Sequence, residues 1–289
     1  MSNFTYVSSA AYDFSGNLLN VNSSGGTITD LDNDDVFVVN DLMPGGVSTY
    51  EGTVVMGGVT MPVTFVTLFG ANQFLVYNPG PGAVSFDSVL PSLTLQPYTF
   101  CFGAGTLIRT ESGEVAVEAL HRGDVLLTAE GRRTAVRWIG RQTIFPVFRP
   151  EASSQLVRIA PGALGEGRPL AALTVTADHG LLLDGVICHA GALVNGTTIT
   201  PVPRAELAQG VTVYHIETEA HEIILANGAP AETFIDNASR RGFDNYAEFE
   251  ALYGEVPEME ELPYPRAMSA RQVPFEIQCA LGLRHRKLG

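Results

Sequence analysis

Hydrophobic and polar residues alternate in short runs along most of the chain, and glycine, proline and asparagine separate these runs. In the first hundred residues, β-type runs occupy residues 36–39, 63–68 and 74–77. Turn-forming clusters punctuate them at residues 45–46, 57–58 and 78–82. A period of two with turns between the runs is typical of antiparallel strands. Residues 1–100 are therefore predicted to form a β-rich domain, folded as a small sandwich or barrel.

The same alternation continues after residue 100. Strands are expected at residues 106–108, 114–118, 125–128, 134–139, 211–217 and 221–225. Residues 246–253 change to helical spacing, and a proline-broken stretch follows them. We therefore predict an all-β module over residues 101–240 and a partly helical tail over residues 241–289.

A weak internal repeat lies within the predicted module. Residues 119–123 (Ala-Leu-His-Arg-Gly) are followed 73 positions later by residues 192–196 (Ala-Leu-Val-Asn-Gly). A strand bearing a threonine and a turn glycine precedes each copy. Two related β-units in tandem predict a pseudo-symmetric fold.

Charge is distributed unevenly along the chain. Residues 1–100 contain neither lysine nor arginine and carry a net charge of −8, whereas all 17 basic residues lie after them. This shift indicates a domain boundary near residue 100. The overall charge of −14 is unlike the basic footprint that nucleic-acid binding needs, so no nucleic-acid partner is expected.

No apolar run is long enough for a transmembrane segment. The first residues also lack the basic and apolar regions of a secretory signal peptide. We therefore expect a cytoplasmic protein or one exported by a route that is independent of a signal peptide.

An acidic stretch near residue 30 presents alternate carboxylates on Asp30, Asp32 and Asp34, which are candidate Ca²⁺ ligands. It fails as an EF-hand loop, because its sixth position is Asp35 rather than glycine and its twelfth is Asp41 rather than glutamate. We favour an acidic, solvated turn.

The three cysteines, Cys101, Cys188 and Cys279, are far apart in the sequence and form no CxxC pair. Neither a disulfide framework nor a thiolate zinc site is indicated. A lone cysteine is most often a buried, inert thiol. Cys101, however, lies at the predicted domain boundary, where it is a candidate nucleophile, whereas Cys188 and Cys279 are interpreted as structural.

A cysteine at this position can attack the carbonyl just before it, here that of Phe100. The attack exchanges an amide for a thioester, so the departing nitrogen of Cys101 needs a proton donor. His179 is a candidate donor, and the hydroxyl of Thr176, three residues earlier, is a candidate to hold the scissile amide. The two side chains converge only if the chain turns at Ala177-Asp178.

From Cys101 to about Gly228 the chain resembles Hint (hedgehog/intein) domains, the autoprocessing modules of inteins, hedgehog C-terminal domains and bacterial intein-like proteins. The first block of that family is matched by Cys101-Phe102, Gly105-Thr106, Ile108, Thr110, Gly113, Val117-Glu118, Leu120 and Gly123-Asp124. A Thr-x-x-His block is matched by residues 176–179, and the penultimate block by Val213-Tyr214-His215-Ile216, His221 and Ala226-Asn227-Gly228.

The resemblance implies a pseudo-symmetric Hint β-fold with Cys101 as nucleophile, His179 as proton donor and Thr176 as its helper. His215 lies where many inteins carry an aspartate, and it is a candidate general base for resolving the thioester. For His221, a catalytic role and a hydrogen bond to a backbone carbonyl within the sheet are equally favoured. The chain departs from splicing inteins because Asn227-Gly228 leads into Ala229-Pro230 and no terminal His-Asn pair follows.

Full splicing is therefore not expected. We predict a single-turnover cysteine autoprotease whose substrate is its own N-terminal segment, with no cofactor or metal required. Water, a thiol, an amine or an alcohol would accept the acyl group. Two alternatives are a β-rich adhesive or Ca²⁺-binding surface protein that uses the fold only as a scaffold, and a cysteine hydrolase that acts in trans.

Overall fold

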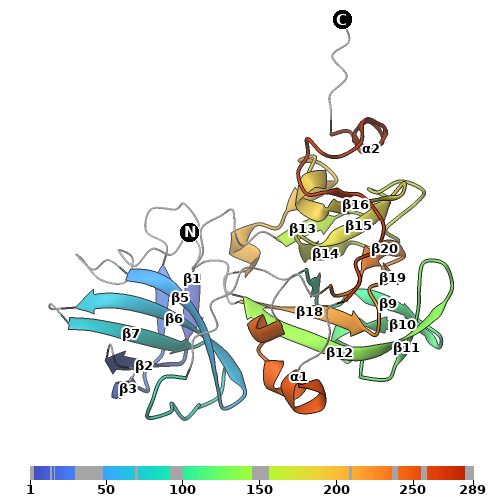
Figure 1. The fold of residues 1–289 in the computed structure, drawn as a ribbon. Helices are drawn as coiled ribbons and strands as arrows, with labels where there is room; N and C mark the ends of the chain where they lie inside the picture. Colours follow the sequence, from blue (N-terminus) through green and yellow to red (C-terminus); the bar gives the residue numbers. More distant parts are fainter. Residues whose placement is uncertain are drawn as a thin grey trace, which may run out of the picture. The chain divides into compact units, whose positions relative to one another are not determined.

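Figure 1 shows the computed structural model of the 289-residue chain. It describes residues 3–13, 15, 17–29, 48–68, 71–91, 100–144, 156–207, 210–235, 240–254 and 259–283. The chain forms two compact units. The N-terminal unit comprises residues 1–97, 143–153 and 203–211, and the C-terminal unit comprises the rest.

The N-terminal unit contains a five-stranded antiparallel sheet in the order β3-β2-β7-β6-β5 and a two-stranded sheet, β1-β4. The strand bounds are β1 Asn3–Tyr6, β2 Ser8–Asp13, β3 Leu18–Asn22, β4 Gly26–Thr29, β5 Ser48–Met56, β6 Val59–Leu68 and β7 Ala71–Asn78. Buried side chains of the large sheet form the core of this unit, with Tyr12, Met56 and Met61 as its largest members. The Tyr12 hydroxyl donates a hydrogen bond of 2.9 Å to the backbone carbonyl of Asp87.

The predicted runs at residues 63–68 and 74–77 lie within β6 and β7, and Gly57-Gly58 forms the turn between β5 and β6. Both glycines have positive φ values, of 57° and 78°, which explains why this turn uses glycine. The expected strand at residues 36–39 lies outside the described residues. So do the candidate Ca²⁺ ligands Asp30, Asp32 and Asp34.

A sheet of fourteen strands organises the rest of the chain, thirteen of them in one continuous order. It runs β17-β13-β14-β8-β18-β12-β11-β9-β19-β20-β15-β16-β21, and β10 pairs with β9 beside this path. The bounds are β8 Phe102–Gly103, β9 Leu107–Thr110, β10 Gly113–Ala116, β11 Val125–Leu127, β12 Arg133–Ile144, β13 Leu156–Ile159, β14 Leu173–Thr176, β15 Gly180–Leu183, β16 Val186–His189, β17 Ile199–Pro201, β18 Val211–Thr218, β19 Ile223–Ala226, β20 Ala229–Glu232 and β21 Arg266–Ala267.

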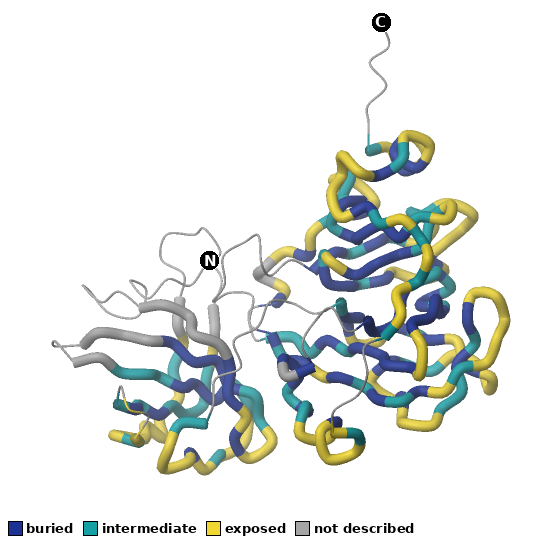
Figure 2. The backbone as a smooth tube through the Cα atoms, viewed as in Figure 1, coloured by how far each residue is buried: buried dark blue, intermediate teal, exposed yellow. Residues whose placement is uncertain are grey.

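Short helical elements complete the fold. The 3-10 helices are η2 Val117–Ala119, η5 Ala190–Leu193, η6 Arg204–Leu207 and η7 Arg240–Gly242, and the α-helices are α1 Tyr246–Tyr253 and α2 Phe275–Ala280. The predicted strand at residues 114–118 ends earlier than expected, because the chain enters η2 at Val117. Burial explains the alternating pattern seen in the sequence, since buried residues recur along the strands and exposed ones gather in turns (Figure 2).

The sequence repeat corresponds to a structural repeat. The elements β9, β10 and η2 begin at residues 107, 113 and 117, and β15, β16 and η5 begin at residues 180, 186 and 190. Every element of the second set therefore lies 73 positions after its counterpart. The all-β, pseudo-symmetric fold class predicted from the sequence is confirmed.

Two hairpins of the C-terminal unit use the same turn chemistry. Asp184-Gly185 joins β15 to β16, and Asn227-Gly228 joins β19 to β20. Asp184 and Asn227 have φ values of 45° and 47°, and the following glycines both have a φ of 77°. Positive φ at both central residues is the geometry of the type I′ turn, which favours Asp-Gly and Asn-Gly.

Asn227 has a second structural role. Its Oδ1 accepts a hydrogen bond of 2.7 Å from the Leu107 amide, and its Nδ2 donates one of 2.8 Å to the Ala172 carbonyl. The residue is 5% exposed. One side chain therefore joins the β19–β20 hairpin to the start of β9 and to the residue before β14.

The described residues after 240 belong to the C-terminal unit and pack against its strands. The ring of Phe249 in α1 lies 5.2 Å from that of Trp138 on β12, and Asn245 accepts a hydrogen bond of 2.8 Å from the Arg141 amide. Further on, β21 pairs in parallel with β16. The division of the chain into domains at residues 1–100, 101–240 and 241–289 stays a prediction. Among the described helices, none has the length and apolar character needed to cross a membrane.

We predict that Asn227→Ala lowers the free energy of unfolding of the C-terminal unit by about 2–4 kcal/mol. The variant loses two buried hydrogen bonds and replaces asparagine, which tolerates positive φ, by alanine, which disfavours it. Trp138 is the single tryptophan of the chain and is buried in this unit, so its fluorescence in a urea titration reports the unit's unfolding.

The matched control is Asp184→Ala. It makes the same change of φ preference at an exposed position, where the side chain forms no hydrogen bond with a described residue. It should lower the free energy of unfolding by about 1 kcal/mol. Equal losses in the two variants would contradict the bridging role of Asn227.

Candidate functional site

The two-residue strand β8 lies between β14 and β18 and brings the three predicted blocks together. Phe102 pairs with Val175 of β14 on one side and with Tyr214 of β18 on the other. One position earlier in both antiparallel registers, Cys101 stands opposite Thr176 and His215. Directly opposed residues project from the same face of a sheet. The topology therefore places Cys101, Thr176 and His215 on one face.

Thr176 holds the amide nitrogen of Cys101. That N–H donates a hydrogen bond of 2.9 Å to Thr176 Oγ1, and the Thr176 N–H donates one of 3.0 Å to the Cys101 carbonyl. Both residues are 0% exposed, and Cys101 is not in a disulfide. The nitrogen of the Phe100–Cys101 peptide bond is thus in contact with the hydroxyl that the sequence predicted for it.

A tight turn after β14 places His179 next to this peptide bond. The His179 N–H donates to the Thr176 carbonyl at 3.0 Å, which closes the turn over Ala177-Asp178 that the sequence required. The His179 ring lies 4.2 Å from the Phe102 ring, measured between centroids. The side chain is 0% exposed, so it lies in the protein interior beside β8.

Burial controls the protonation of His179. It lowers the pKa of His179 to about 4, although the negative charge of Glu232 and the backbone carbonyl of Phe100 both act to raise it, and His189 lowers it further. Neither ring nitrogen makes a hydrogen bond of ordinary length and angle to a described residue. The imidazole is therefore neutral at neutral pH and close enough to the Phe100 carbonyl to interact with it.

His215 shares the interior with His179. Their ring centroids are 6.4 Å apart, and aromatic rings surround His215, with Phe234 at 4.9 Å and Phe243 stacked on it at 5.8 Å. Burial holds the pKa of His215 well below its ordinary value, and His179 adds to this effect. His215 is thus also a neutral imidazole in an apolar setting.

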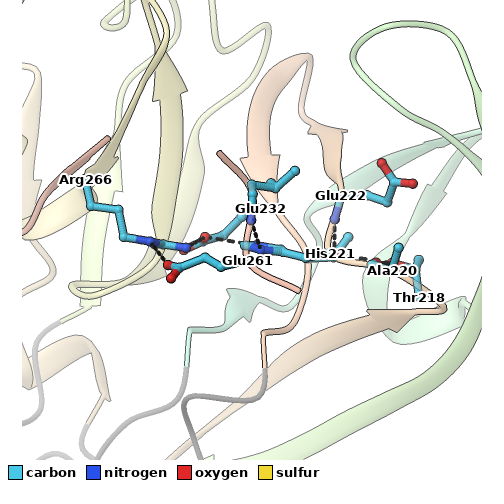
Figure 3. Close-up of polar contacts among 9 residues, drawn as sticks. Thr218, Ala220, His221, Glu222, Glu232, Glu261 and Arg266 are labelled. Atoms are coloured by element: carbon cyan, nitrogen blue, oxygen red, sulfur yellow. Dashed lines mark hydrogen bonds and ion pairs between the residues drawn. The ribbon is translucent and has the colours of Figure 1, made fainter. Parts of the chain in front are cut away.

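His221 makes a different set of contacts (Figure 3). Its Nδ1 accepts a hydrogen bond of 3.2 Å from the Leu262 amide, so the proton of the neutral ring lies on Nε2, which faces Glu232 Oε2 at 3.2 Å. The partners are therefore a backbone N–H and a carboxylate, not the backbone carbonyl that was considered. Through these contacts His221 fixes one side of the Glu232 carboxylate.

Sequence reasoning missed two residues of this region. His189 on β16 lies edge-on to the Phe100 ring at 5.9 Å, and its Nδ1 is 3.7 Å from Asp178 Oδ1. Glu232 is fully buried at the end of β20. Neither residue stands out in the sequence, because each lies in an ordinary short β-run. Both come close to His179 because their strands, β16 and β20, pair with β15, whose first residue follows His179 directly.

The other cysteines are not part of the site. Burial, with the negative charge of Asp184, raises the pKa of Cys188 to about 11, which disfavours the reactive thiolate. Cys279 is exposed in α2. Within the described part of the chain, no group of three or more His, Cys, Asp or Glu side chains is arranged to hold a metal ion.

Comparisons with known proteins agree with this architecture. Residues 100–238 match the family model of the Hint domain. No curated protein in the comparison matches the chain. The solved structures that it resembles include the MchDnaB-1 intein, with 16% identity and a TM-score of 0.33 over 45% of this chain and 98% of that one.

A second solved structure is the bacterial intein-like domain from Clostridium thermocellum, with 18% identity and a TM-score of 0.36 over 47% of this chain and 100% of that one. The family match begins at Phe100, the residue before Cys101, and includes Thr176, His179, His215 and His221. Residues 100–238, which contain the candidate site, are therefore a Hint domain.

Proposed function

We propose that this Hint domain cleaves its own chain at the Phe100–Cys101 peptide bond: an N–S acyl shift forms a thioester, and its resolution by a nucleophile releases residues 1–100. The observation that carries the proposal is the 2.9 Å hydrogen bond from the Cys101 N–H to Thr176 Oγ1. This contact fixes the scissile nitrogen beside the turn that bears His179. A scaffold without chemistry has no need for a buried threonine, a cysteine and an imidazole around one peptide bond.

The proposed reaction begins when Cys101 Sγ attacks the carbonyl carbon of Phe100. His179 takes the thiol proton and delivers it to the Cys101 nitrogen. The carbon–nitrogen bond breaks, a carbon–sulfur bond has formed, and the products are a thioester and a free amine on Cys101. Because the proton moves within the site, this step needs no outside acid or base.

The environment of His179 suits this transfer. A neutral imidazole is able to accept the thiol proton, and its low pKa makes the imidazolium a strong acid toward the amide nitrogen. Contact with the Phe100 carbonyl supplies polarisation where negative charge develops on the oxygen. Water, a thiol, an amine or an alcohol then resolves the thioester, and His215 is the candidate base for that second step.

Cleavage rather than splicing is proposed because Asn227, the asparagine of the penultimate block, is engaged in the fold. Its side chain hydrogen-bonds to the backbones of Leu107 and Ala172. The sequence after it contains no terminal His-Asn pair. The chain is then a single-turnover cysteine autoprotease whose substrate is its own N-terminal segment.

We predict that Cys101→Ala abolishes the cleavage. Freshly expressed wild-type protein should give masses for residues 1–100 and 101–289, with conversion accelerated by a thiol or hydroxylamine, whereas the variant should stay whole. The rate should be independent of dilution, which separates self-cleavage from hydrolysis in trans. Identical products with and without Cys101 would favour the scaffold alternative.

A second prediction concerns the Thr176 hydroxyl. Thr176→Val keeps the shape of the side chain and removes the contact with the scissile nitrogen, so the first-order rate should fall roughly tenfold to a hundredfold. Thr174→Val, two residues earlier on β14 and opposite Gly103 rather than Cys101, is the control and should change the rate little. The rates come from mass spectrometry over time, and a similar loss in both variants would refute the specific role.

A third prediction follows from the pKa of His179. Its neutral form is the one that accepts the thiol proton, so the rate should be constant near neutral pH and fall as the pH drops through about 4. The sign follows from burial, which disfavours the protonated ring until the solution is acidic. Rates measured from pH 8 downward, with circular dichroism to confirm the folded state, test this, and a midpoint near 6.5 would argue against a buried His179.

A further inference from the structure

Glu232 is a fully buried carboxylate at the end of β20, and two side chains hold it in place (Figure 3). Arg266 donates to it through Nη2 at 2.7 Å and Nη1 at 3.3 Å, and His221 Nε2 lies at 3.2 Å. Arg266 is itself paired with Glu261 at 2.5 Å. A buried carboxylate is costly unless it is paired in this way, so the arrangement keeps a negative charge inside the domain.

The carboxylate lies against the backbone next to His179. The pairing of Leu181 with Ala231 sets Gly180 opposite Glu232. A β-carbon at residue 180 would be only 2.2 Å from Glu232 Oε1, so only glycine fits beside the carboxylate. Because Gly180 has no side chain, the Glu232 carboxylate can lie against the backbone next to His179.

The charges around the two buried histidines show what Glu232 does. For His179, the Glu232 carboxylate and the Phe100 carbonyl favour the protonated ring, and His189 opposes it. For His215, Glu232 again favours protonation, whereas His179, His221 and Arg240 oppose it. Glu232 is the one carboxylate among the groups that act on both rings in the described structure.

The Glu232 carboxylate stays negatively charged from neutral pH down to the pH at which His179 gains a proton. Burial alone would raise the pKa of Glu232, but the hydrogen bonds from His221 and Arg266 outweigh it and lower the pKa to about 2. The carboxylate is therefore ionised at the pH at which His179 titrates.

We propose that Glu232 is a positioning residue for the proton transfer at Phe100–Cys101: its carboxylate, held against Gly180, stabilises the positive charge that His179 gains from the thiol. This inference rests on the proposed self-cleavage. It also gives the residues after 238 a role, because Arg266 and the Leu262 amide hold Glu232 and His221 from outside the segment that matches the family model.

The test compares Glu232→Gln, which removes the charge and keeps the shape, with Glu222→Gln as the matched control. Glu222 is also buried and bound to an arginine, Arg132, by two hydrogen bonds, but it is not among the groups that act on His179. Glu232→Gln should lower the plateau rate of cleavage about tenfold for each unit by which the His179 pKa falls, and it should move the acidic limb to lower pH. Glu222→Gln should move neither.

If the role of Glu232 were purely structural, Glu232→Gln would lower the plateau rate of cleavage without moving the acidic limb of the pH profile. That outcome would overturn the proposal. Glu232→Asp, which restores the charge, should recover the limb at least in part. The His179 pKa, measured by NMR titration with Cys101 replaced by alanine, tests the inference without any cleavage. A lower pKa in Glu232→Gln supports the charge effect even if the chain does not cut itself, whereas an unchanged pKa refutes it even if cleavage is real.

Discussion

The pairing of β8 between β14 and β18 is the constraint on which the site depends. Only Phe102 and Gly103 form this strand, yet they set Cys101 opposite Thr176 on one side and His215 on the other. Gly103 contributes through its small size, because a β-carbon there would meet the Thr174 side chain and backbone at 3.2 Å. The close approach of β8 to β14 gives the hydrogen bond between the Cys101 amide and the Thr176 hydroxyl its length of 2.9 Å.

Burial of histidine is the second physical feature of the domain. His179 and His215 lie among Phe102, Phe234 and Phe243, and their ring nitrogens make no hydrogen bonds of ordinary geometry to described residues. Unsatisfied buried polar groups cost about 1–3 kcal/mol each. His179 and His215 carry this cost in the protein interior, and buried imidazoles with lowered pKa values are common at functional sites.

The segment after residue 240 is structurally part of this arrangement. Phe243 stacks on His215, the Leu262 amide binds His221, and Arg266 binds Glu232. His215, His221 and Glu232 are thus each in contact with a residue between positions 243 and 266. The family model ends at residue 238, so these contacts belong to this chain rather than to the matched segment.

The sequence by itself determined the all-β class of the Hint domain, several of its strands and its internal repeat. Alternation with a period of two located β6, β7, β9 to β12, β18 and β19, the 73-residue offset located the repeat, and helical spacing located α1 at Tyr246–Tyr253. These features are local, and local patterns survive in a single sequence. Cys101, Thr176 and His179 became candidates in the same way, because they match short motifs, and the structure brings them close together.

Only the tertiary structure decided which side chains share a space. The sequence left His221 between two roles, and the structure shows it in contact with the Leu262 amide and the Glu232 carboxylate. It gave no role to Glu232, which is 53 residues from His179 in the chain but lies against Gly180 across β15 and β20. Burial, pKa and electrostatic contact depend on long-range strand pairing, and no pattern within one strand encodes the identity of its neighbour.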